Sequence, residues 1–182
     1  MFPFKKRDSG RRKTIERLYG AIVAQARSPV FYRDLGVPDT VEGRFDLLVL
    51  HMHLVSERLT AAGEAGVALG QELLDHFFED MDASLREIGI GDLSVPKKMR
   101  TLAEAYLGRS ALYKDAIARG DQAALSAAIA RNILGGADAG EALPLATYTA
   151  ETAAHLNRQP IQRLLEGHVE FPAPTKAAAD AE

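Results

Sequence analysis

Ser94 and Lys97 are the two residues whose types and spacing come nearest to a catalytic pair. In the Ser-x-x-Lys arrangement, the lysine can activate the serine hydroxyl as a nucleophile at the start of a helix. Enzymes that use this pair also need Ser-Asp-Asn and Lys-Thr-Gly elements beside a β-sheet, and this sequence has neither element. We therefore interpret Ser94 as a helix N-cap that accepts a backbone N–H bond, and we expect a protein that is not an enzyme.

Three histidines are the candidates for a metal or haem ligand. His51 and His53 lie about 200° apart around a helix axis, so they cannot bind one ion together. His76 is four residues from both Glu72 and Asp80, but the second Glu-x-x-His motif of a helical-bundle metal site is missing. We expect structural histidines, no metal and no cofactor, because one hydrogen bond satisfies a buried imidazole. The alternative is a helical carrier of haem or another hydrophobic small molecule, with His51 as the ligand.

The segment 89–99 joins a glycine-containing loop to a helix that starts with the wrong charge. The positive end of a helix macrodipole favours acids, whereas Lys97, Lys98 and Arg100 each cost up to about 1 kcal/mol there. Such a loop can present backbone N–H groups, and the lysines would form a positive rim for phosphate, carboxylate or an acidic partner. Alternatively, the lysines pair with the acidic face of the preceding helix. The residues that shape the loop are Gly89, Gly91, Asp92 and Pro96.

Apolar residues at helical spacing predict the elements that position these residues. No segment shows the two-residue alternation of a β-strand, so we expect an all-α fold, a single compact multi-helix domain of about six to seven helices. The helix over 40–62 is apolar around much of its circumference and should be the most buried, with Asp39 to Glu42 as its capping box. The predicted helices cover about 9–28 and 40–62, then run from a Gly63–Gly70 connector to Gly89, from Ser94 to Gly120, from Asp121 to Gly135, over 142–157 and from Pro160 to about Val169.

Charge divides the chain of 182 residues into three parts. Residues 1–17 carry seven Lys or Arg against two acids, although the whole chain has a net charge of −3. We expect a basic N-terminal arm over 1–14, a helical domain over 15–169 and a disordered tail over 170–182. The arm could contact a ribosome or an anionic membrane surface.

Composition excludes several classes of protein. The chain has no cysteine, which removes disulfides and Cys-ligated metals and fits a reducing compartment. No apolar stretch is long enough for a transmembrane segment, and the N-terminus lacks the apolar region of a secretory signal. We expect a cytoplasmic protein, or one that is peripheral at the inner membrane, without specific nucleic-acid binding.

Five ordered blocks of sequence resemble the ubiquinol–cytochrome c chaperone family, in a bacterial-type member. The resemblance covers about residues 15–135, and the five blocks occur at matching spacing. Mitochondrial members carry an N-terminal targeting extension that this sequence lacks, which favours a bacterial cytoplasmic protein. The blocks are 18–32 (LYGAIVAQARSPVFY), 36–45 (GVPDTVEGRF), 80–82 (DMD), 89–99 (GIGDLSVPKKM) and 106–109 (YLGR).

The resemblance implies an assembly chaperone that binds newly made cytochrome b. Such a chaperone keeps cytochrome b competent for haem insertion and for entry into the respiratory bc1 complex. Mitochondrial relatives act with a small partner protein near the ribosomal exit tunnel. For Tyr113 the alternative is core packing, and for Arg109 a bridge to Asp80 or Asp82. The partner-binding residues that we predict are Arg44, Lys97, Lys98 and Arg109 with the aromatic residues Phe31, Tyr32 and Tyr113.

Overall fold

The computed structural model describes residues 4–175, with side chains from Ser9 onward. These residues form helices and no β-strand, which confirms the predicted all-α fold. The short α2, which begins with Pro29 at its first position, was not predicted. The helices are α1 (Phe4–Ala26), α2 (Pro29–Arg33), α3 (Val41–Thr60), α4 (Glu64–Glu87), α5 (Val95–Arg119), α6 (Gln122–Asn132), α7 (Leu143–Arg158) and α8 (Ile161–Leu165).

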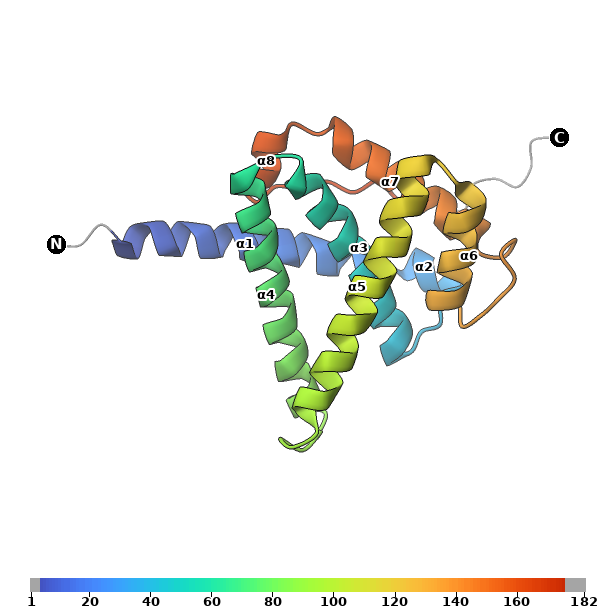
Figure 1. Cartoon of the computed structure of the whole chain (residues 1–182), viewed down its shortest axis with the longest axis horizontal. Coiled ribbons are helices and arrows are strands. Elements are labelled where there is room, and N and C mark those ends of the chain that lie inside the picture. The colour runs from blue at the N-terminus through green and yellow to red at the C-terminus, as the bar shows by residue number, and fades with distance from the viewer. Residues whose placement is uncertain (1–3, 176–182) are drawn as a thin grey trace.

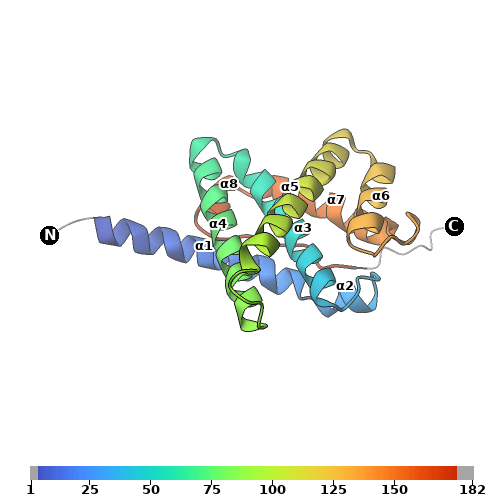
Figure 2. The ribbon, with the colours of Figure 1, turned by 60° about the horizontal axis from the view of Figure 1, so that its bottom comes forward.

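α3 lies at the centre of the molecule, as predicted for the helix over 40–62 (Figures 1 and 2). It packs against α1, α4, α5, α7 and α8 because its buried residues occupy every turn from Gly43 to Leu59. Thr40 caps the helix, with its side chain accepting a hydrogen bond from the Gly43 N–H at 3.1 Å. The capping box expected from Asp39 is wrong, because Asp39 instead forms an ion pair with Arg44.

α4 begins directly after Gly63, so the predicted Gly63–Gly70 connector is wrong. Its first turn touches the last turn of α3 at Gly66, where an added Cβ would lie 2.0 Å from the Leu59 carbonyl oxygen. Only glycine permits this close approach of the two helices. Gly66, one of the glycines of the predicted connector, therefore serves helix packing.

The predicted basic arm is continuous with α1, which begins at Phe4. In Figure 1 the N-terminal half of α1 extends beyond the other helices. Two polar contacts join α1 to α4. The Arg11 Nε donates to Glu72 at 2.9 Å, and the Tyr19 hydroxyl donates to Asp80 at 2.7 Å.

The predicted tail begins with residues that pack on the body. Phe171 lies edge-on against His51, with ring centroids 5.5 Å apart. The Gln25 side-chain amide donates to the Pro172 carbonyl at 3.1 Å. The disorder expected from residue 170 therefore does not describe residues 171 and 172, and residues 176–182 lie outside the described part of the chain.

In the second half of the chain, helices end and begin at residues that the sequence predicted. Gly120 ends α5 with φ +63°, and Asp121 caps α6 by accepting from the Ala124 N–H at 2.9 Å. α5 packs on α6, and α6 packs on α7. Within residues 4–175, no helix is both long enough and apolar enough to span a bilayer.

Candidate functional site

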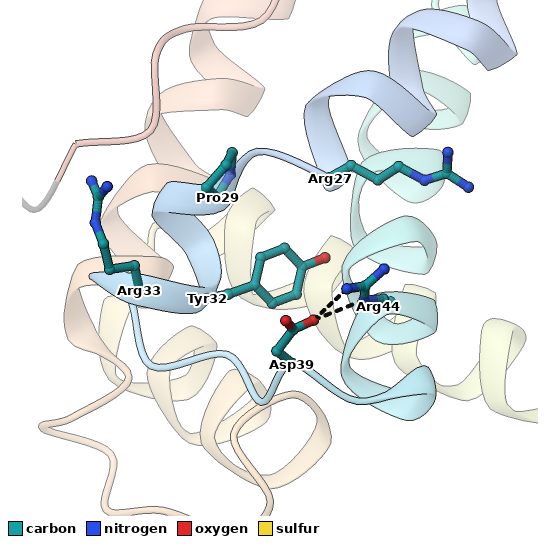
Figure 3. A pocket seen from close by; sticks show the side chains of 6 residues that line it. All are labelled: Arg27, Pro29, Tyr32, Arg33, Asp39 and Arg44. Atoms are coloured by element: carbon teal, nitrogen blue, oxygen red, sulfur yellow. Dashed lines mark hydrogen bonds and ion pairs between the residues drawn. The ribbon is translucent and has the colours of Figure 1, made fainter.

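A surface cavity of about 480 Å³ lies where α1 ends, α2 turns and α3 begins (Figure 3). It is an open depression of the surface rather than an enclosed pocket. The chain bends here because Ser28-Pro29 ends α1 and starts α2, and Thr40 then caps α3. The lining residues are Arg27, Pro29, Tyr32, Arg33, Asp39 and Arg44.

Tyr32 and Arg44 form the centre of this cavity. The Arg44 guanidinium lies over the Tyr32 ring, 5.9 Å from the ring centroid, and Asp39 holds it by an ion pair of 2.8 Å. The Tyr32 hydroxyl donates to the Ala26 carbonyl at 2.7 Å, so the ring is fixed between α1 and α3. Burial raises the pKa of Tyr32, which keeps its hydroxyl neutral. An aromatic face beside a cation suits a partner's acidic or aromatic side chain.

Two further arginines border the cavity. Arg27 has no ion-pair partner among the described residues, whereas Arg33 pairs with Asp34 at 2.7 Å. In Figure 3 the Arg33 side chain points away from Tyr32 and Arg44. The net charge of the cavity is therefore positive, with Arg27 available to a ligand.

The second predicted cluster forms the turn between α4 and α5. Gly89 has φ +88° and closes α4 as a left-handed residue, as predicted, with the Ile90 N–H bonded to the Leu85 carbonyl. Lys97 and Lys98 are exposed, and neither forms an ion pair with a described residue. The alternative that they pair with the acidic face of α4 is thus wrong. Ser94 precedes α5, but its side chain makes no cap bond, so that prediction is also wrong.

Phe31 and Tyr113 lie inside the fold rather than at its surface, so neither side chain is open to a partner, whereas the Arg109 side chain is 21% exposed. The Arg109 guanidinium pairs with Asp46 of α3, not with Asp80 or Asp82. Phe31 and Tyr113 have no exposed side-chain surface. Burial raises the pKa of the Tyr113 hydroxyl. Core packing is therefore the right interpretation of Tyr113.

Asp46 carries the most perturbed carboxyl group of the fold. Burial raises its pKa to about 6, and the charge of Arg109 opposes the shift. The ion pair of Asp46 with Arg109 was not predicted, because the sequence shows Asp46 only as a polar residue in an otherwise apolar helix. Its position in the helix that was expected to be most buried could have indicated that it needs a charged partner.

His51 is a structural histidine, as expected. Its Nδ1 lies 2.8 Å from the Leu47 carbonyl and its Nε2 lies 2.9 Å from the Tyr148 hydroxyl. Burial lowers its pKa to about 4, so the ring is neutral at neutral pH. Because both ring nitrogens are engaged and the ring is fully buried, His51 offers no free ligand for the haem carrier.

The other chemical candidates do not form a site. His76 lies edge-on against Tyr19 at 4.9 Å, and its two predicted acidic neighbours bond to Arg11 and Tyr19. Among the described residues, no three His, Asp or Glu side chains come together in a way that could hold a metal ion. The structure thus brings together two exposed clusters, the cavity and the α4–α5 turn.

Comparisons with known proteins agree with the fold and cover most of the chain. A family model described as ubiquinol-cytochrome C chaperone matches residues 33–171. The Xenopus laevis protein named ubiquinol-cytochrome-c reductase complex assembly factor 1 is 25% identical over 118 residues, which are 65% of this chain and 58% of that relative. The chain therefore spans well under the full length of this relative. The crystal structure of the Cbp3 homolog from Brucella abortus is similar with a TM-score of 0.85 and 37% identity, over 93% of this chain and 94% of that one.

The family match includes the α4–α5 turn and the α3 side of the cavity. Asp39 and Arg44 lie inside the matched residues, whereas α1 and most of α2 precede them. The α4–α5 turn is therefore part of the shared domain, whereas the cavity is only partly so, because Arg27, Pro29 and Tyr32 precede the matched residues.

Proposed function

Since the chain belongs to the ubiquinol-cytochrome C chaperone family, we propose that it is an assembly chaperone that binds newly made cytochrome b and supports its haem insertion and its incorporation into the respiratory bc1 complex. The observation that carries the proposal is the family match over residues 33–171. The name of the Xenopus laevis relative, an assembly factor of ubiquinol–cytochrome c reductase, supports the same complex. The identity of the client, cytochrome b, is implied by the sequence resemblance.

The cavity around Tyr32 and Arg44 is the surface that we assign to the client. Tyrosine and arginine are enriched among the residues that dominate binding energy at protein interfaces. Here the two side chains are held in place before any partner arrives, because Asp39 fixes Arg44 and the Ala26 carbonyl fixes Tyr32. A fixed side chain loses little conformational entropy on binding. An acidic client side chain would meet Arg27 and Arg44 at the rim.

The buried members of the predicted set have positioning roles in this proposal. Phe31 packs against His51 and Tyr148, with ring centroids 5.4 and 5.0 Å apart, and so anchors α2 to the core. Arg109 lies over the ring of Phe45, the residue that follows Arg44 on α3. In this proposal Phe31, which is fully buried, holds α2 in place beneath the cavity and does not touch the client.

The function is tested by deleting the gene in its host and recording the reduced-minus-oxidised spectrum of membranes. We expect loss of the b-type haem signal and of assembled bc1 complex, with recovery when the gene is restored. Tagged protein should also capture cytochrome b. An unchanged b-haem spectrum together with an empty capture would contradict the proposal.

The client surface is tested with the same capture and matched variants. Arg44→Ala and Tyr32→Ala should each reduce captured cytochrome b by about tenfold or more, the size expected for dominant interface residues. Tyr32→Phe should reduce capture less than Tyr32→Ala, because it keeps the ring under Arg44 and loses only the hydroxyl bond to the Ala26 carbonyl. Arg119→Ala is the control, since Arg119 is an exposed arginine of α5 paired with Asp115. Equal capture by Arg44→Ala and Arg119→Ala would place the client elsewhere.

A further inference from the structure

The turn between α4 and α5 projects from the molecule and carries solvent-exposed apolar side chains. We call residues 86–101 the hairpin tip. In Figure 1 the tip lies beyond the ends of all other helices at the lower edge of the view. Leu93 is 99% exposed and Ile88 is 66% exposed, although Val95 next to them is buried. The leucine and isoleucine side chains at the tip are therefore accessible to a binding partner.

The same tip carries uncompensated positive charge. The tip has four basic and two acidic residues, which give it a net charge of +2, whereas the whole chain has a net charge of −3. Arg86 pairs with Asp92 of the tip and with Asp82 of α4, so the acid nearest Leu93 already has its partner. The remaining cations, Lys97, Lys98 and Arg100, form no ion pair with a described residue.

The cations also stand where α5 favours acids. α5 has no acidic residue in its first turn, and its N-cap side chain makes no hydrogen bond to that turn. Positive charge at this end opposes the helix macrodipole. No described residue forms an ion pair with Lys97 or Lys98, which points to an external negative charge as their partner.

We propose that the hairpin tip docks on an anionic phospholipid surface, with Leu93 and Ile88 entering the headgroup boundary and Lys97 and Lys98 among the lipid phosphates. Apolar side chains beside lysines are the combination by which peripheral segments bind anionic membranes. A convex tip presses into a soft lipid surface, whereas a protein partner would need a preformed hollow to receive Leu93. A lysine ammonium group is a point charge without the planar, two-pronged geometry of arginine, so it can interact with a layer of phosphates that have no fixed positions.

This surface is distinct from the client cavity and from the basic residues of α1. The proposed membrane contact goes beyond the proposed function, because it does not depend on cytochrome b and can be measured with purified protein and lipid alone. The competing element is the start of α1, where Arg12 and Lys13 are exposed. The test must therefore separate the tip from α1.

The first experiment measures binding of the purified full chain to vesicles by flotation. Vesicles of phosphatidylcholine alone are compared with vesicles that hold phosphatidylcholine and phosphatidylglycerol in equal parts. We expect binding to the anionic vesicles only, weakening as salt rises. Leu93→Ser, and Lys97→Gln combined with Lys98→Gln, should each lower the partition coefficient by about tenfold or more.

Two matched controls accompany these variants. Leu107→Ser removes another exposed leucine, 65% exposed against 99% for Leu93, from the middle of α5 and should leave binding unchanged. Arg12→Gln combined with Lys13→Gln removes two charges from α1 and should retain the dependence on Leu93. All of these sites are exposed, so the variants should fold as the unmodified chain does.

The second experiment uses the absence of tryptophan from the sequence. Leu93→Trp places a single fluorophore at the tip, and its emission should shift to the blue when anionic vesicles are added. Leu107→Trp should show no shift. Absence of binding by the unmodified chain, unchanged binding of the tip variants, or loss of binding in the α1 variant alone would each overturn the proposal. Binding of the tip to an acidic protein but not to the vesicles would overturn it in the same way.

Discussion

The Asp46 carboxylate of α3 and the Arg109 guanidinium of α5 form an ion pair that is nearly closed to solvent. Their side chains are 11% and 21% exposed, and Arg109 also lies over the Phe45 ring, 5.9 Å from its centroid. Taking two charges out of water is costly, and their mutual attraction offsets only part of the cost. The pair therefore links stability to pH, and the α3–α5 contact depends on both partners.

The first prediction concerns the pH dependence that Asp46 contributes. Its pKa of about 6 in the folded protein exceeds the ordinary value of 3.8, so the folded state binds this proton more tightly. The contribution of Asp46 to the free energy of unfolding should therefore fall as pH rises from about 4 to 6. Relative to Asp46→Asn, the unmodified chain should lose up to about 3 kcal/mol across this window. Urea unfolding at a series of pH values measures the difference, and parallel profiles would contradict it.

The second prediction concerns Arg109. Arg109→Ala leaves the Asp46 carboxylate without its partner and should lower the free energy of unfolding at pH 8 by about 3 kcal/mol. Because Arg109 opposes the burial effect, the same change should raise the pKa of Asp46 further. Adding Asp46→Asn to Arg109→Ala should restore part of the stability. Urea unfolding checks both effects, and equal stability of the single and double variants at pH 8 would count against the pair.

The third prediction concerns acid unfolding through His51. Burial lowers its pKa to about 4, so the unfolded chain binds the proton more tightly between about pH 4 and 6.5. Stability should be lost as pH falls through this window, by up to about 3 kcal/mol from His51. His51→Gln should lose less on acidification than the unmodified chain. Proton NMR should find the His51 ring neutral at pH 6, and a charged ring at that pH would falsify the assignment.

The fourth prediction compares two glycines of α4. Gly66→Ala would bring a Cβ to 2.0 Å from the Leu59 carbonyl oxygen and should destabilise the fold by about 3 kcal/mol through overpacking. At Gly70 the nearest side-chain atom would be 3.9 Å away, so Gly70→Ala should stabilise α4 by up to about 1 kcal/mol. Thermal unfolding of the two variants gives the contrast. A similar change in both would mean that α3 and α4 do not approach as closely as described.

Periodicity was enough to predict every helix except the short α2, and the central place of α3. It was not enough for the α3–α4 contact, because a glycine that permits close packing looks the same in sequence as a glycine in a connector. Gly66 belongs to the first kind, and only the position of Leu59 reveals it.

The candidate site was predicted in part. Arg44 with Tyr32, and the loop residues before Lys97, do form exposed clusters, since charge and turn chemistry are local properties. Phe31 and Tyr113 are buried, and Arg109 pairs with Asp46, because burial depends on which helices come to lie alongside. Arg27 was missed, since nothing in its immediate sequence marks the edge of a cavity.

The central position of α3 has a consequence for the order in which the protein is made. The helices that cover α3 include α7 and α8, and the partner of His51, Tyr148, follows it by 97 residues. At the usual speed of translation, this interval takes about 5 to 20 seconds. Until then α3 leaves the ribosome with much of its apolar surface uncovered. The face of α3 that α7 and α8 cover is therefore open to aggregation and proteolysis during this interval, and the core around His51 is complete only after α7 has been made.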